Sequence, residues 1–160
     1  NNRAEAFWMK KGILGDTVPL ELNAKELVHR NNKNSELTVY GYTPMMVSVQ
    51  CVQKTMDHCN HACVQYVLKD RYQKEFRGVC SCEFCYNTIY NTLPTSLLKE
   101  KEKAEKLGVK AYRLSFTIET QQETEKIVRA FVDVYLRGQK PDGQMQTEET
   151  TKGHFQRGVE

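Results

Sequence analysis

The six cysteines of the chain all lie between positions 51 and 85, and the rest of the sequence contains none. Their spacing is C-x7-C-x3-C-x16-C-x-C-x2-C. A compact chain of 160 residues buries roughly 70% of its unfolded surface, so it does not need disulfides merely to fold. Three arrangements can crowd cysteines in this way: a metal site, a set of disulfides, or a buried core that contains free thiols.

The start of the chain gives no sign of export to an oxidising compartment. Asn1–Lys11 lacks the apolar segment of a signal peptide and the initiator Met, so we expect part of a longer, cytoplasmic protein. No apolar run approaches the roughly 20 residues of a membrane span. The net charge of +3 is too mild to imply nucleic acid. In a reducing cytoplasm, clustered cysteines more often bind metal than form disulfides.

The first forty residues predict a strand, a helix and a second strand. The apolar run Thr17–Leu22 is typical of a buried strand. Asn23 followed by Glu26 indicates a capping box for a helix over Ala24–His29. A second strand is expected over Glu36–Tyr40. Short connections between these elements favour the βαβ unit of a parallel sheet.

The middle of the chain interrupts this pattern with an expected β-hairpin. Gln65–Lys69 and Glu75–Val79 are short apolar-alternating segments on either side of the polar turn Asp70–Lys74. The cysteines lie just before or after these two strands. We therefore expect a small cysteine-bearing insertion, residues 51–91, on an α/β scaffold.

The pattern of alternating strands and helices then resumes. A helix is expected over Pro94–Leu107, a strand over Ala111–Thr117, and a helix from the capping box of Thr120 and Glu123 to about Arg137. The apolar stripe of this last helix is expected in the core, and it comprises Ile127, Val128, Phe131, Val134 and Tyr135. The polar stretch that follows, residues 141–152, is expected to be flexible. The sequence thus predicts one α/β domain, residues 1–160.

Four converging thiolates need a cation between them because their negative charges repel. A single Zn²⁺ can bind all four tetrahedrally, and a [4Fe–4S] cluster accepts four cysteines as well. The C-x3-C and C-x2-C spacings let two ligands come from one turn of backbone, while the hairpin brings back the others. Since six cysteines exceed four, two would be spare. His58 and His61 flank Cys59 and could replace a thiolate at a zinc site.

The sequence offers few elements of other catalytic sites. A nucleophilic cysteine would need a base, and the histidines remote from the cysteines are His29 and His154. Neither G-x-S-x-G nor H-E-x-x-H occurs. Glu21 and Glu119 lie at the carboxyl ends of expected strands, where ligand sites form in parallel α/β scaffolds. Both could equally be surface carboxylates.

Several segments resemble the U32 peptidase family, also called the collagenase-like protease family. The segments that carry the resemblance are Tyr40–Cys51, Cys59–Cys63, the "LKDR" stretch within Tyr66–Arg71, and Cys85–Asn91. Matches also occur in Thr17–Asn23, Arg113–Glu119 and Gly153–Glu160, so the resemblance covers nearly the whole chain. It implies that the chain forms the carboxyl-terminal β/α units of a TIM-like barrel, with the amino-terminal remainder of the same protein as its partner. It also implies four ligands, namely Cys51, Cys59, Cys63 and Cys85. Cys80 and Cys82 fall outside that pattern, and either could replace Cys85.

The resemblance implies two kinds of activity. The family name indicates a peptidase that acts on peptide substrates, yet the sequence shows no recognisable protease motif. Other members of the family are iron–sulfur proteins that act in hydroxylation of RNA bases or of a quinone precursor. We therefore expect a [4Fe–4S] protein that serves oxygen-independent hydroxylation, with RNA as a substrate. The alternatives are a peptidase and a zinc-stabilised binding module.

Overall fold

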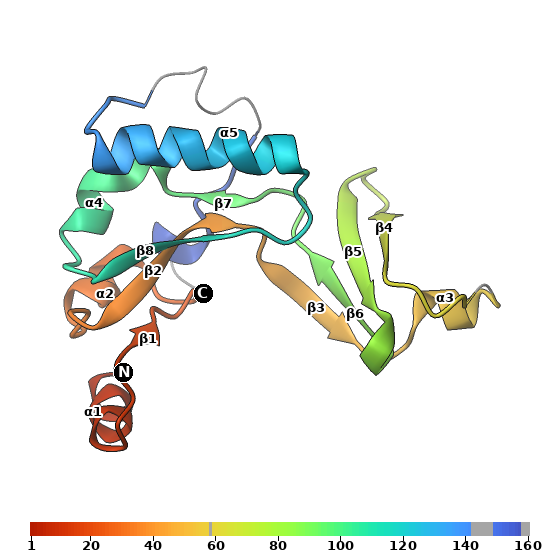
Figure 1. Cartoon of the computed structure of the whole chain (residues 1–160), viewed down its shortest axis with the longest axis horizontal. Helices are drawn as coiled ribbons and strands as arrows, with labels where there is room; N and C mark the ends of the chain where they lie inside the picture. Colours follow the sequence, from red (N-terminus) through yellow and green to blue (C-terminus); the bar gives the residue numbers. More distant parts are fainter. Residues whose placement is uncertain (58, 142–148, 158–160) are drawn as a thin grey trace. The chain divides into compact units, whose positions relative to one another are not determined.

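The structure is a computed structural model that describes residues 1–57, 59–141 and 149–157. The chain forms two compact units (Figure 1). The first, called the α/β unit, comprises Asn1–Gly41, Thr95–Phe116 and Thr120–Glu160. The second, called the cysteine unit, comprises Tyr42–Pro94 and Thr117–Glu119. The cysteine unit therefore includes the whole expected insertion, residues 51–91.

The α/β unit is built on a small mixed sheet whose longest strand is β2. Its four strands are β1 (Asp16–Thr17), β2 (Ser35–Gly41), β7 (Thr95–Ser96) and β8 (Ala111–Ser115). Strands β1 and β8 each pair with β2 in parallel, while β7 pairs with β2 in the antiparallel direction. The expected α/β class with parallel strands is confirmed. The strands described here do not close into a barrel.

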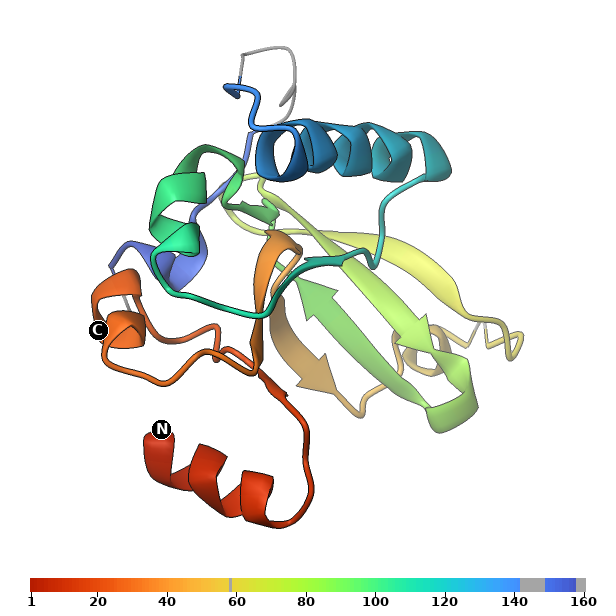
Figure 2. The same cartoon turned by 60° about the vertical axis from the view of Figure 1, so that its left-hand side comes forward.

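Helices connect and cover these strands within the α/β unit (Figures 1 and 2). Among the described residues of this unit, the helices that do so are α2 (Ala24–Val28), α4 (Lys101–Glu105) and α5 (Gln121–Phe131), while α1 (Asn2–Lys10) precedes β1. Both expected capping boxes are confirmed. The Asn23 side chain accepts the N–H of Glu26, whose carboxylate accepts the N–H of Asn23, and Thr120 and Glu123 repeat this exchange. Local sequence thus sets where α2 and α5 begin.

Two expected elements are shorter than the sequence indicated. The strand expected over Thr17–Leu22 ends at Thr17, with one further bond from the Val18 N–H to the Glu36 carbonyl at 2.9 Å. Pro19 follows, and its missing N–H cannot extend the ladder. The helix expected over Pro94–Leu107 is limited to α4, Lys101–Glu105. The residues before it form strand β7 and a 3₁₀ turn, Leu98–Glu100.

A tertiary contact explains the late start of α4. The N–H of Ser96 bonds to the Thr151 carbonyl and that of Leu97 to the Val39 carbonyl, both at 2.8 Å. These bonds hold the segment in an extended conformation, so local helix propensity is overridden. Residues 142–148 of the stretch that we expected to be flexible lie outside the described residues.

Aliphatic and aromatic side chains form the core of the α/β unit. Buried members include Leu27, Val39 and Leu97. On α5 and the π-helical turn after it (Val132–Leu136), the expected stripe is mostly confirmed, because Phe131 and Val134 are buried while Ile127 and Tyr135 are half-buried against the core. Val128 was expected in the core, but it is 37% exposed. It points away because only part of the helix circumference faces the sheet.

The cysteine unit contains an antiparallel sheet of four strands in the order β3-β6-β5-β4. Its elements are β3 (Pro44–Ser48), α3 (Val52–Thr55), β4 (Val64–Lys69), β5 (Glu75–Ser81) and β6 (Tyr86–Tyr90). The expected hairpin is confirmed as β4 and β5, and Asp70 holds its turn by accepting the N–H groups of Tyr72 and Lys74. Among the described residues, no helix is both long and apolar enough to cross a membrane.

Candidate metal centre

Three separate segments of the cysteine unit bring the six cysteines together. Cys51 precedes α3, and Cys59 and Cys63 lie between α3 and β4. Cys80 lies on β5, Cys82 begins the 3₁₀ turn Cys82–Phe84, and Cys85 follows that turn. The ladder between β4 and β5 pairs Val64 with Cys80. The hairpin therefore returns the second group of cysteines to the first, as the sequence predicted.

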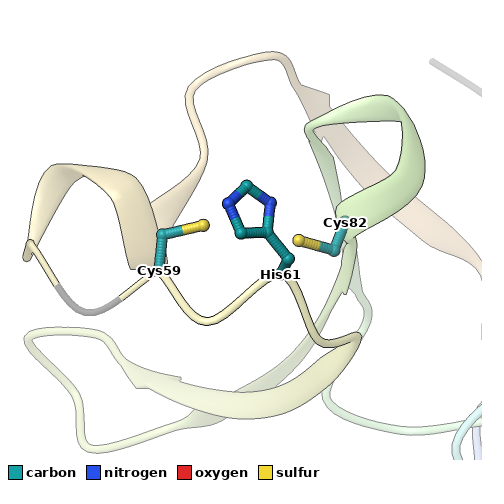
Figure 3. Close-up of side chains that lie close together, drawn as sticks. All are labelled: Cys59, His61 and Cys82. Carbon is teal, nitrogen blue, oxygen red and sulfur yellow. The ribbon is translucent and has the colours of Figure 1, made fainter.

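Cys59, His61 and Cys82 form the tightest group of possible metal ligands. Their ligand atoms all lie within 4.8 Å of one another. Figure 3 shows the two sulfur atoms on either side of the imidazole ring. Cys82 is buried, whereas Cys59 and His61 are exposed. Two sulfurs and an imidazole nitrogen supply three of the four ligands of a tetrahedral site.

A second contact joins Cys51 to Cys80, whose sulfur atoms are 3.6 Å apart. Both side chains are buried, and together with Cys82 they form a small cluster against Val64 and Tyr66. This cluster belongs to the same region as the group in Figure 3, because Cys82 is a member of both. The thiols therefore occupy the place where a purely apolar core would otherwise lie.

The two buried thiols of this contact differ in their readiness to ionise. Burial raises the pKa of Cys80 to about 11, and its hydrogen bond to Cys51 acts in the same direction. The pKa of Cys51 is lowered, chiefly because the backbone N–H of Lys54 bonds to its sulfur, although burial opposes this. Either sulfur can donate the hydrogen bond between them. Cys51 is the better candidate for a thiolate ligand.

The remaining thiols lie close enough to change the pKa values of the buried thiols by electrostatic repulsion. The pKa of Cys82 is raised, chiefly by burial. The neighbouring Cys59 raises it further, and Cys51 and Cys85 do so more weakly. Cys63 contributes to the raised pKa of Cys80. Each ionised thiol therefore opposes ionisation of the next, and a bound cation would remove that opposition.

The structure places the ligands expected from the resemblance in different surroundings. Cys59 belongs to the group in Figure 3, and Cys51 contacts Cys80. Cys63 and Cys85 are exposed, and the Cys85 sulfur lies 3.7 Å from the carbonyl oxygen of Cys82. The two cysteines outside the family pattern are both buried: Cys80 contacts Cys51, and Cys82 belongs to the group in Figure 3.

A local signal could have drawn attention to Cys80 and Cys82. They are two residues apart at the end of an expected strand, and such residues share one face of the strand. The alternative ligand His61 joins the group, whereas His58 lies outside the described residues. The contact of His61 with Cys82 was not evident from the sequence, because it joins two segments.

The other candidate residues are not members of this group. His29, His154 and Glu21 belong to the α/β unit. Glu119 belongs to the cysteine unit, where one carboxylate oxygen accepts the N–H groups of Thr117 and Ile118 at 2.7 and 3.0 Å. These bonds give Glu119 a structural role in the turn between β8 and α5.

The donor set fits a metal that prefers sulfur, since thiolates select zinc and iron–sulfur clusters over hard cations. Both zinc and an iron–sulfur cluster are compatible with this donor set. Comparisons of the chain with known protein families, with curated proteins and with solved structures found no match. The residues of the site therefore carry the functional argument.

Proposed function

We propose that the cysteine unit holds a [4Fe–4S] cluster and that the protein serves oxygen-independent hydroxylation. The observation that carries this proposal is the convergence of cysteines from three segments, with three of them buried as a cluster. A bound cluster would supply electron transfer. The buried cluster of Cys51, Cys80 and Cys82 would shield one side of it from water.

The structure favours three cysteines as ligands. Cys51 has a lowered pKa, and Cys59 and Cys82 belong to the closest group of ligand atoms. Cys63 or Cys85 would supply the fourth thiolate, as the resemblance to the U32 family implies. Cys80 would remain a thiol that donates a hydrogen bond to Cys51, because its own pKa is about 11. Such hydrogen bonds tune the potential of a cluster.

The α/β unit would act as the carboxyl-terminal β/α units of a TIM-like barrel. Strands β1, β2 and β8 run parallel, and α2 and α5 follow the first and last of them, which supports this reading. The substrate proposed here is RNA. The exposed cations Arg71, Lys74 and Arg77 on the β4–β5 hairpin support a polyanionic partner.

Purification without oxygen tests the cluster directly. We expect brown protein with about four irons per chain and acid-labile sulfide. Colourless protein without iron or sulfide would remove the basis of the proposal. Loss of RNA hydroxylation by the full-length protein when Cys59 is replaced by Ser would connect the cluster to the reaction.

A zinc-stabilised binding module is the second candidate, and His61 is the observation that favours it. Imidazole is a common zinc ligand, and sites with both cysteine and histidine are typical of structural zinc. One zinc per chain and no iron after anaerobic purification would establish this candidate instead. Zinc in aerobically purified protein would not, because zinc readily occupies thiolate sites that iron has left.

The closeness of His61 to Cys59 also supports the peptidase alternative. A thiol beside an imidazole, as in Cys59 and His61, is the arrangement of a nucleophile and its base. Gelatin hydrolysis by the full-length protein that persists in Cys51→Ser but disappears in Cys59→Ser and His61→Ala would favour this alternative. Activity that depends equally on Cys51 and Cys82 would instead reflect loss of the metal centre.

A further inference from the structure

Cys59 and Cys82 form a pair in which one thiol is open to water and the other is not. Cys59 is exposed, whereas Cys82 is only 7% exposed. Both are free thiols, and their sulfur atoms lie within 4.8 Å of one another (Figure 3). Redox-sensitive cysteines are typically accessible and lie beside a second thiol that can complete a disulfide. This pair has both features.

The backbone allows one of these sulfurs to move toward the other. Cys59 lies between α3 and β4, where the described residues form neither helix nor strand. Cys82 begins the 3₁₀ turn after β5, and its carbonyl accepts the Cys85 N–H at 3.3 Å. A disulfide needs sulfurs about 2.05 Å apart, so the two atoms must approach by less than about 3 Å. Loop residues adjust more readily than residues held in a turn beside a paired strand, so Cys59 supplies the movement.

The imidazole ring of His61 does not block this approach. An imidazole atom placed between the sulfurs would need a contact of about 3.5 Å with each, which would hold the sulfurs roughly 7 Å apart. The separation of the two sulfurs is at most 4.8 Å. The ring therefore lies beside the line that joins them, and the His61 side chain is itself exposed.

The buried pair of Cys51 and Cys80 provides a contrast within the same unit. Its sulfurs are closer, at 3.6 Å, but Cys51 is only 6% exposed and Cys80 is fully buried. An oxidant in solution reaches an exposed thiol first, because susceptibility to oxidation follows exposure. Access to solvent, and not the distance between sulfurs, should therefore decide which pair reacts.

We propose that a peroxide converts Cys59 and Cys82 into a disulfide and that this reaction releases the bound metal. Written with protonated sulfurs, the Cys59 thiol and hydrogen peroxide first give a sulfenic acid and one water. The Cys82 sulfur then attacks the sulfenic sulfur, the S–O bond breaks, and a second water leaves. The two sulfurs together lose two electrons, which reduce the peroxide to water. A thiol reductant reverses the change by disulfide exchange.

Disulfide formation and metal binding exclude each other at these two sulfurs. Metal ligation by cysteine requires thiolates, and sulfurs joined in a disulfide carry no negative charge. Cys59 and Cys82 are both ligands of the proposed centre, so a single reaction removes two ligands. This regulation rests on the metal centre proposed above, whereas the pairing of the two thiols does not.

The full chain loaded with zinc tests the pairing, because zinc is not itself oxidised and its release reports on the thiols. Hydrogen peroxide is added in equimolar steps, free thiols are alkylated, and the protein is digested with trypsin without reduction. The cysteines fall into three tryptic peptides, residues 34–54, 55–69 and 78–99. The first disulfide should link residues 55–69 to residues 78–99, while Cys51 is recovered alkylated. Tandem mass spectrometry of the linked peptides should show Cys59 joined to Cys82.

Metal binding and matched variants complete the test. The oxidised protein should bind zinc at least about tenfold more weakly, until a thiol reductant restores the affinity. Cys59→Ser should abolish the link, whereas Cys63→Ser, which alters another exposed cysteine of the same loop, should retain it. Protein unfolded in urea should lose the preference for this pair. A first link that includes Cys51, or an equally fast link in Cys59→Ser, would overturn the inference.

Iron content after anaerobic purification separates this inference from the proposed function. Iron-containing protein whose zinc-loaded form links other cysteines would overturn this inference alone. A link between Cys59 and Cys82 in protein that takes up neither iron nor zinc would support the pairing and contradict the proposed metal centre.

Discussion

The α/β unit and the cysteine unit are stabilised by different chemistry. Leu27, Val39 and Leu97 represent a broad apolar core in the α/β unit. In the cysteine unit, the described buried cluster consists of three cysteines, with Val64 and Tyr66 packed against it. Apolar burial can account for the first unit. In the second, a metal bound to those thiols would add stabilisation to this small cluster.

Large apolar side chains are exposed in both units, Phe7, Trp8 and Leu14 among them in the α/β unit, but the cysteine unit is the smaller of the two. Several large apolar side chains of this unit lie on its surface, namely Met45, Met46, Val47, Val49, Met56 and Val67. These side chains contribute little to a core because they remain in contact with water. A unit that uses its apolar residues in this way has a small apolar driving force for folding. Its sheet should therefore depend on the metal centre more than the sheet of the α/β unit does.

Metal removal should produce the largest difference between the units. With a chelator under reducing conditions, we expect β4 and β5 to lose protection from amide hydrogen exchange, while β2 and β8 keep theirs. A structural metal can contribute about 10–16 kcal/mol to folding, which exceeds what the small cluster of the cysteine unit supplies. Protection of β5 that survives complete metal removal would contradict the contrast.

A core substitution should act on the other unit. Leu97 is 1% exposed, so Leu97→Ala should lower the free energy of unfolding of the α/β unit by about 2–5 kcal/mol. Val28 is 59% exposed, and Val28→Ala should change the free energy of unfolding by about 0.5 kcal/mol or less. Chemical denaturation followed by exchange in β2 measures both effects. Metal content should be the same in the two variants, and its loss in Leu97→Ala would show that the units are not independent.

Replacing Cys82 and Cys80 in turn should show which of these buried cysteines is a metal ligand. Cys82→Ser should lower metal affinity by at least about tenfold, since even residues behind the ligands contribute that much. Cys80→Ser should have a smaller effect, because a hydroxyl can still donate to Cys51. Competition with a chromophoric chelator gives both affinities. If Cys80→Ser lowered metal affinity more than Cys82→Ser did, Cys80 would be the ligand.

Acid should weaken the α/β unit slightly through Glu100. Burial tends to raise the pKa of this carboxyl, but its bonds to Lys103 and Lys152 prevail and lower the pKa below the ordinary value. The ion pairs are therefore fully effective above about pH 4.5, and their contribution is lost as the pH falls through the lowered pKa. Glu100→Gln should remove this pH dependence, an effect of about 1 kcal/mol or less. Denaturation of both proteins between pH 3 and 7 measures it, and parallel pH profiles would exclude a role for Glu100.

Features set by neighbouring residues could be predicted from the sequence. The caps at Asn23 and Thr120 and the hairpin turn at Asp70 depend on side chains only a few residues apart. The early part of the expected helix over Pro94–Leu107 could not be predicted, because Thr151 and Val39 supply its hydrogen bonds from distant positions. Long-range pairing decides such segments.

The same distinction applies to the candidate metal centre. The spacing of the cysteines predicted their convergence, since the hairpin between Cys63 and Cys80 returns the chain to its starting point. Which cysteines meet depends on side-chain packing across segments. The burial of Cys80 and Cys82 and the contact of His61 with Cys82 therefore became evident only from the structure.

Elemental analysis of anaerobically purified protein, with a visible spectrum of the same sample, tests the central claim most directly. The account predicts about four irons and matching sulfide per chain, together with the broad absorption of an iron–sulfur protein. One zinc per chain would retain a metal–thiolate centre and replace the cluster by the second candidate. Protein that contains no metal, has six freely titratable thiols and keeps a protected β4–β5 hairpin would contradict the claim.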